Sequence, residues 1–189
     1  MTQSFTEEKT GGKRKLPPAK RAALLGMTGA LALIINRLEY LLPALPFLPP
    51  GAKPGFSNLA VMLAVSEMPA SDAFLIVLLK AGFALVTRGA TAALTSLFGG
   101  VLSYIVLLLT LKREKSPFGM IGIGILSALA HNSGQLLAAC IMTGSMKTLA
   151  YAPALTVFAL ISGSATGAVY GAVYRRIHNM IDNRGLFEK

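Results

Sequence analysis

A polar cluster stands in the middle of a long apolar segment at Ala128-Leu129-Ala130-His131-Asn132-Ser133-Gly134-Gln135-Leu136. The segment, 118–142, is long enough as a helix to cross a bilayer core of about 30 Å. Gln135 lies four positions after His131 and three after Asn132, so these side chains share one broad helix face. Polar groups at this depth are costly unless they pair or line a cavity, which predicts a binding site. The alternative is hydrogen bonding between helices, worth about 1 kcal/mol or less per contact.

The composition is that of a membrane protein. Of the 189 residues, 53% are apolar and 14% are charged, and the mean hydropathy is +0.61. These values fit neither an ordinary soluble domain nor a disordered chain. We therefore expect an all-α membrane protein, a bundle of six transmembrane helices. Cys140 is the single cysteine, which excludes an intrachain disulfide and leaves packing as its role.

The net charge of +10 does not indicate a nucleic-acid partner. Lys and Arg gather at the two ends of the chain and in the turn 112–115, and no basic helix face is interleaved with aromatic residues. The basic, Gly- and Pro-punctuated N-terminal segment is instead expected to lie near anionic membrane lipid.

The apolar segments predict six spans, at 22–42, 58–67, 73–87, 91–111, 118–142 and 153–174. The second is too short to cross a bilayer alone, so it either continues into the preceding loop or stays inside the bundle. Phe98-Gly99-Gly100 is expected to interrupt the fourth span, at a place where helix backbones can approach closely.

Prolines and capping residues predict the connections. The segment 43–54 holds five prolines, which forbid a continuous helix, and we expect an ordered loop there because Leu and Phe are frequent. Ser57 is predicted to cap the second helix, and Ser71 or Asp72 the third. Arg88-Gly89-Ala90 predicts a tight connection.

The distribution of positive charge predicts the orientation. Thirteen of the eighteen Lys and Arg residues lie in the two terminal segments and the turn 112–115, which places these parts in the cytoplasm. We expect a basic cytoplasmic tail at 1–21, a transmembrane domain at 22–176 and a cytoplasmic C-terminal tail at 177–189. The proline-rich loop, Arg88 and the loop 143–152 then face outward.

Lys80 is a charged residue near the middle of the third span. An ionised amine there costs about 2.5–3.5 kcal/mol on insertion scales. The sequence offers Lys80 no obvious carboxylate, because Glu39, Glu67 and Asp72 all fall near the ends of spans. An anionic ligand would supply the missing charge. The alternative is a snorkelling or deprotonated amine bonded to His131 or to backbone carbonyls.

Further polar residues lie beside the loops expected on the outer side. Lys53, Arg88 and Lys147 could together attract a carboxylate or phosphate, although solvation is the common state of any one loop charge. Asn58 and Tyr151 flank these loops as polar contacts, or alternatively as a cap and an interfacial anchor. The predicted substrate-binding set is therefore Lys53, Asn58, Lys80, Arg88, His131, Asn132, Gln135 and Tyr151.

Two stripes of small residues mark helix contact faces. The first comprises Ala22, Gly26 and Ala30, and the second comprises Gly163, Gly167 and Gly171. Packing within the chain is the default for both. Docking on a separate membrane protein is the alternative, favoured for the first stripe because the basic tail belongs to the same helix.

The residues for enzymatic chemistry are missing. Asp72 and Asp182 are the only aspartates, far apart, so no acidic cluster can hold magnesium on a diphosphate. The chain has no phosphate-binding Gly-Lys-Ser or Gly-Lys-Thr loop for ATP hydrolysis. His131 and His178 have no metal-ligand spacing. We expect no enzyme activity, no metal and no cofactor.

Four motifs follow one another along the chain: PGAKPGFSNL at 50–59, FGGVLS at 98–103, HNSGQ at 131–135 and YAPAL at 151–155. Over about residues 22–174 the chain resembles the Gx transporter family, often labelled heptaprenyl diphosphate synthase component I. That family is similar in plan to the S components of energy-coupling-factor (ECF) transporters. The resemblance implies six helices, cytoplasmic termini, a bacterial cytoplasmic membrane and a pocket near the outer face. It also implies that Ala22, Gly26 and Ala30 dock on a transmembrane coupling subunit that carries two ATPases.

Three functions remain open at this point. The first is an S-component-like subunit that captures a small, anionic vitamin- or cofactor-like molecule for uptake. The second is a noncatalytic membrane accessory subunit of prenyl diphosphate or quinone metabolism. The third is a homo-oligomeric structural membrane protein, which depends only on the stripe at Gly163, Gly167 and Gly171.

Overall fold

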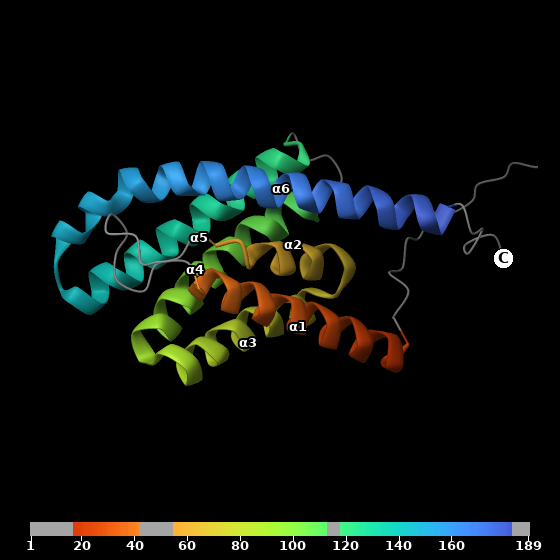
Figure 1. Cartoon of the computed structure of the whole chain (residues 1–189), viewed down its shortest axis with the longest axis horizontal. Coiled ribbons are helices and arrows are strands. Elements are labelled where there is room, and N and C mark those ends of the chain that lie inside the picture. Colours follow the sequence, from red (N-terminus) through yellow and green to blue (C-terminus); the bar gives the residue numbers. More distant parts are fainter. Residues whose placement is uncertain (1–16, 42–54, 113–117, 183–189) are drawn as a thin grey trace, which may run out of the picture.

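The protein is a bundle of helices (Figure 1). The structure, a computed structural model, describes residues 17–41, 55–112 and 118–182. The elements are α1 (Pro18–Leu41), α2 (Asn58–Glu67), α3 (Ala70–Arg88), α4 (Ala90–Leu111), α5 (Met120–Thr143), the 3₁₀ helix η1 (Met146–Tyr151) and α6 (Ala152–Asp182). These described ranges contain no strand. The prediction of an all-α membrane bundle is confirmed.

Five helices, α1, α3, α4, α5 and α6, are long and apolar enough to cross a bilayer. The chain is therefore a multi-pass membrane protein. Helix α2 has only ten residues and stays inside the bundle, in contact with α1, α3, α4 and α6. Its Ala60, Val61, Ala64 and Val65 are completely buried, so α2 forms part of the core.

The turns between helices follow local backbone preferences. Helix α3 begins directly after Pro69, whose fixed φ suits the residue before a helix. Helices α3 and α4 are joined through Gly89, which has φ of +86°, a conformation that favours glycine. The predicted tight connection at residues 88–90 is confirmed.

The predicted side-chain caps are wrong. Ser57 precedes α2, but its backbone is already helical and its side chain makes no capping hydrogen bond. Ser71 and Asp72 lie within the first turn of α3 rather than before it, because Pro69 sets the start of the helix. The Asp72 carboxylate instead binds Arg21.

Glycines set the contacts of α5 with its two neighbours. Helix α4 is continuous through Phe98-Gly99-Gly100, so the expected interruption is wrong, while the expected close approach is confirmed. A Cβ placed on Gly134 of α5 would lie 2.7 Å from Gly99 Cα of α4. The stripe at Gly163, Gly167 and Gly171 packs against the start of α5. It therefore serves packing within the chain, which removes the basis of the homo-oligomer hypothesis.

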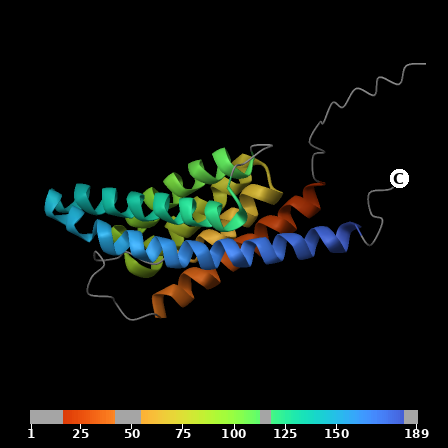
Figure 2. The ribbon, with the colours of Figure 1, turned by 90° about the horizontal axis from the view of Figure 1, so that it is seen from above.

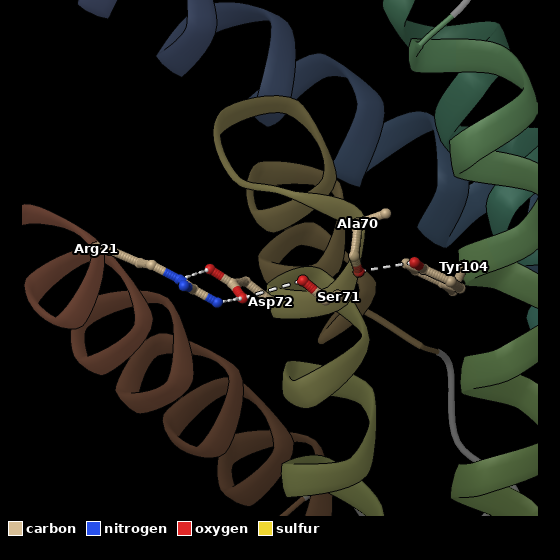
Figure 3. A network of polar contacts seen from close by, with 5 residues as sticks. All are labelled: Arg21, Ala70, Ser71, Asp72 and Tyr104. Atoms are coloured by element: carbon tan, nitrogen blue, oxygen red, sulfur yellow. Dashed lines mark hydrogen bonds and ion pairs between the residues drawn. The ribbon is translucent and has the colours of Figure 1, made fainter. Parts of the chain in front are cut away.

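Helix α1 runs obliquely to α6 (Figure 2) and is tied to α3 by charge near its N-terminal end. Arg21 donates through Nε and Nη2 to the two oxygens of Asp72, each at 2.5 Å, and Tyr104 donates to the Ala70 carbonyl at 2.7 Å (Figure 3). Asp72 is fully buried, whereas the Arg21 side chain is half exposed. The opposite end of α1 contributes to the polar pocket described next.

Candidate functional site

A polar pocket opens at the end of the bundle where α1 ends and α4 begins. About 280 Å³ of space between atoms lies within it when open solvent is included, and about 20 Å³ of that space has room for the centre of a water molecule. Nine of its ten lining residues are polar or charged, and they come from four helices and the residue before α2: Asn36, Glu39, Ser57, Lys80, Arg88, Ala92, Thr95, Ser96, His131 and Gln135. Ligand sites in proteins more often have mainly apolar walls, so this lining is suited to a polar ligand.

Helix α1 supplies one wall through Asn36 and Glu39, which are three positions apart and therefore on one face. Both are almost fully buried, at 3% and 5% exposure. Asn36 Oδ1 accepts a hydrogen bond from Arg88 Nη2 at 3.2 Å, and Glu39 Oε1 accepts one from the Ser57 backbone N–H at 3.3 Å. These bonds join α1 to the end of α3 and to the start of α2.

Lys80 lies on α3 at 1% exposure and donates from Nζ to Asn58 Oδ1 at 3.4 Å. The prediction that no carboxylate is near Lys80 is wrong, because Glu39 lines the same pocket. Depth along each helix can be read from the sequence, but the packing that brings the end of α1 to the same pocket as Lys80 cannot.

Helix α5 supplies His131 and Gln135, one turn apart and both buried. The His131 ring lies against α4 where Gly99 leaves room, since a Cβ on Gly99 would be 2.8 Å from its Cε1 and Nδ1. His131 Nδ1 has no hydrogen-bond partner among the described residues. The absence of a side chain at Gly99 therefore allows the imidazole to reach the pocket.

Asn132 and Tyr151 lie elsewhere. Successive residues of a helix point about 100° apart, so Asn132 faces α6 while His131 faces α4. Asn132 Nδ2 donates to the Leu155 carbonyl at 2.8 Å, and Asn132 lines a separate pocket between α5 and α6. Tyr151 ends η1 and packs against Leu136 and Leu155.

The other predicted residues do not line the polar pocket among the described residues. Lys53 lies outside the described residues. Lys147 is exposed on η1 and does not line the polar pocket. Ala22, Gly26 and Ala30 are all exposed on α1, and a Cβ on Gly26 would meet nothing within 4 Å. This stripe is therefore not used for packing among the described residues.

Sequence reasoning missed Asn36, Glu39, Ser57, Thr95 and Ser96 as pocket residues. The sequence carries a signal for Asn36 and Glu39, because they are polar residues within the first predicted span and share a helix face. The sequence predicts Ser57 to be a helix cap instead. Thr95 and Ser96 carry no comparable signal, because hydroxyl side chains in apolar helices usually bond to their own backbone, as Thr95 does to the carbonyls of Thr91 and Ala92.

The described residues contain no group of three or more His, Cys, Asp or Glu side chains arranged to hold a metal ion. What the pocket does provide is one carboxylate, two basic groups, an imidazole and several amides and hydroxyls. Such an arrangement can bind a small polar molecule by charge and hydrogen bonds.

Fold and site together define a multi-pass helical membrane protein with a small polar pocket between its helices at one end. The chain belongs to the family described as heptaprenyl diphosphate synthase component I, whose model matches residues 28–173. A solved structure of the S component of a bacterial ECF transporter has the same fold, with a TM-score of 0.64 at 17% identity, covering 87% of this chain and 99% of that one. A comparison with curated proteins gives no match.

Proposed function

We propose that this protein is the substrate-binding membrane subunit of an uptake system and takes up a small, anionic vitamin- or cofactor-like molecule. The observation that carries the proposal is the pocket at one end of the bundle, where charged and amide groups are held between membrane-spanning helices. Burying such groups costs free energy that a ligand of matching polarity offsets. The S-component fold supports the same function.

The proposed ligand-binding residues are Lys80, Arg88, His131 and Gln135, which line the pocket, and Asn58, which is hydrogen-bonded to Lys80 behind it. Lys80 and Arg88 bring positive charge from α3, and Gln135 and His131 bring hydrogen-bonding groups from α5. Asn58 orients Lys80 through their hydrogen bond. Lys53 is proposed to add charge from the sequence segment before α2.

Transport in this proposal needs a separate coupling module with ATPase activity, because the chain carries no phosphate-binding loop of its own. The exposed stripe at Ala22, Gly26 and Ala30 is the proposed docking face for a transmembrane coupling subunit. Small residues allow a partner helix to approach closely, and nothing within this part of the structure occupies the face at Gly26. The proposal assigns the chain no catalytic step.

The test is retention of a small molecule by the full chain, purified gently in lipid nanodiscs and analysed by mass spectrometry. Lys80→Ala and Gln135→Ala should each lower the amount retained by about tenfold or more, since each removes a buried polar contact. Lys147→Ala, an exposed lysine outside the pocket, is the matched control and should change nothing. Equal retention by the parent and both pocket variants would refute the site.

The family description favours a second function, a noncatalytic membrane accessory subunit of prenyl diphosphate or quinone metabolism. Affinity purification of the full chain from its native membranes distinguishes the two. Copurifying ATPase and transmembrane coupling subunits support uptake, whereas a copurifying soluble prenyl synthase supports the accessory role.

A further inference from the structure

The polar pocket contains a carboxylate that a receptor for a simple anion does not need. Glu39 lines the pocket together with Lys80 and Arg88, so the described lining carries one acidic and two basic side chains. Glu39 is 5% exposed and Lys80 is 1% exposed, so water screens these charges little. The pocket therefore presents both signs of charge to whatever enters it.

This mixture of charges discriminates between ligands. A ligand that is only anionic is attracted by Lys80 and Arg88 but repelled at short range by Glu39. A ligand that also carries an N–H donor turns that repulsion into a charge-assisted hydrogen bond, because an ionised carboxylate only accepts. A purely cationic ligand is attracted by Glu39 but repelled by Lys80 and Arg88.

The hydrogen-bonding groups behind the pocket indicate where the anionic group belongs. Asn58 Oδ1 is occupied by Lys80 Nζ, while Asn58 Nδ2 is a buried donor with no acceptor among the described residues. Asn58 is 2% exposed. Lys80 lines the pocket and Asn58 is bonded to it from behind, so the donors Lys80 Nζ and Asn58 Nδ2 lie on the same side of the pocket, where a carboxylate or phosphate oxygen would find acceptable partners. Glu39 comes from a different helix, so donors and acceptor stand on separate walls.

We infer that the ligand of this pocket is a small amphoteric molecule, with an oxyanion held by Lys80 and Asn58 and an N–H donor group held by Glu39. The inference rests on the proposed function, since it concerns the same pocket and narrows its substrate class. The other role for Glu39 is a purely structural ion pair with Lys80. That role predicts no dependence of ligand choice on Glu39, which an experiment can measure.

The first experiment identifies the compounds released from the full chain in lipid nanodiscs. Glu39→Gln keeps the size of the side chain and removes its charge, and Glu67→Gln makes the same change at the exposed end of α2. The expected result is a retained compound with both an acidic group and an N–H donor. Glu39→Gln should retain less of this compound than the parent protein by about tenfold or more. Glu67→Gln should retain the parental amount.

Two outcomes overturn the inference while leaving the proposed function intact. They are a retained acid that lacks an N–H donor, or undiminished retention by Glu39→Gln when Gln135→Ala still releases the compound. No compound above the level of empty nanodiscs would refute both the proposed function and the inference.

The second experiment uses only the unmodified protein, so its result does not depend on whether a variant folds. The thermal unfolding midpoint of the unmodified protein is followed by helical circular dichroism with β-alanine, which has an amine and a carboxylate, and with butyrate, which has only the carboxylate. β-Alanine should raise the midpoint more than butyrate at equal concentration, because ligand binding to the folded state stabilises it. Equal shifts, or a larger shift with butyrate, contradict an amphoteric site.

Discussion

Replacing Gly134 by alanine should separate the two helices that hold the pocket's imidazole. Gly134 lies on α5 between His131 and Gln135, and its α-carbon faces the backbone of α4. A Cβ at this position would lie 2.6 Å from the Phe98 carbonyl carbon and 2.7 Å from Gly99 Cα, with the Phe98 oxygen also in contact. Every one of these atoms is backbone, so no side chain can turn aside to relieve the overlap.

The size of the effect follows from these distances. Carbon atoms in good contact lie about 3.5–4.0 Å apart, so α4 and α5 must separate by about 1 Å at this point. Overpacking of a close-packed interior costs about 1–3 kcal/mol, and a backbone clash belongs at the upper end of that range. The better helix propensity of alanine returns up to about 1 kcal/mol. The net expectation is a loss of about 2 kcal/mol, or about 4–8 °C in the unfolding midpoint for a chain of this size.

The assay is thermal unfolding of the full chain in lipid nanodiscs, followed by circular dichroism, with small-molecule retention measured on the same samples. Gly26→Ala is the matched control, because a Cβ there meets nothing within 4 Å. It should leave the midpoint unchanged or raise it by a few degrees, about 2–4 °C. Gly134→Ala should also reduce retention, since it displaces His131 and Gln135. A midpoint for Gly134→Ala equal to that of Gly26→Ala would refute the close-packing argument.

Three further predictions concern other parts of the molecule. Arg21→Ala removes both guanidinium hydrogen bonds from a buried carboxylate of α3 and should cost about 1–3 kcal/mol in unfolding free energy, whereas the exposed Lys20→Ala should cost almost nothing. Asn132→Leu should lower the unfolding midpoint through the lost bond to α6, worth about 1 kcal/mol, yet leave small-molecule retention at the parental level; a large loss of retention would place Asn132 in the site. Gly26→Leu should abolish copurification of a transmembrane coupling subunit without lowering the midpoint, and undiminished copurification would exclude the stripe as the docking face.

Much of the fold could be predicted because its signals are local. A helix that crosses a bilayer must form its backbone hydrogen bonds internally and present apolar side chains to the lipid. The length and hydropathy of a span can therefore be read from consecutive residues. The predicted third span, 73–87, matches α3 at Ala70–Arg88, and the fourth, 91–111, matches α4 at Ala90–Leu111. The predictions of side-chain caps were wrong because Ser and Asp side chains have several possible hydrogen-bond partners. Tertiary packing decides that α3 begins after Pro69 and that Asp72 binds Arg21 instead of the end of the helix.

The residues of the candidate site could likewise be predicted from the sequence only in part. His131 and Gln135 could be found from the sequence, because polar residues at membrane depth and helical spacing are a local pattern. Asn132 belongs to the same pattern but faces α6, since only the position of α4 and α6 around α5 distinguishes its face from that of His131. Adjacent positions on one helix thus have different roles that their spacing alone does not separate.

The amino-acid sequence alone determined that this is an α-helical membrane protein with polar side chains buried in its fifth span. That Glu39 and Lys80 line the same pocket, and which amides reach it, was decided only by the tertiary structure. The physical reason is that helix periodicity is encoded by residues a few positions apart. The tilt and rotation of one helix against another depend on how glycine-lined surfaces from distant segments pack.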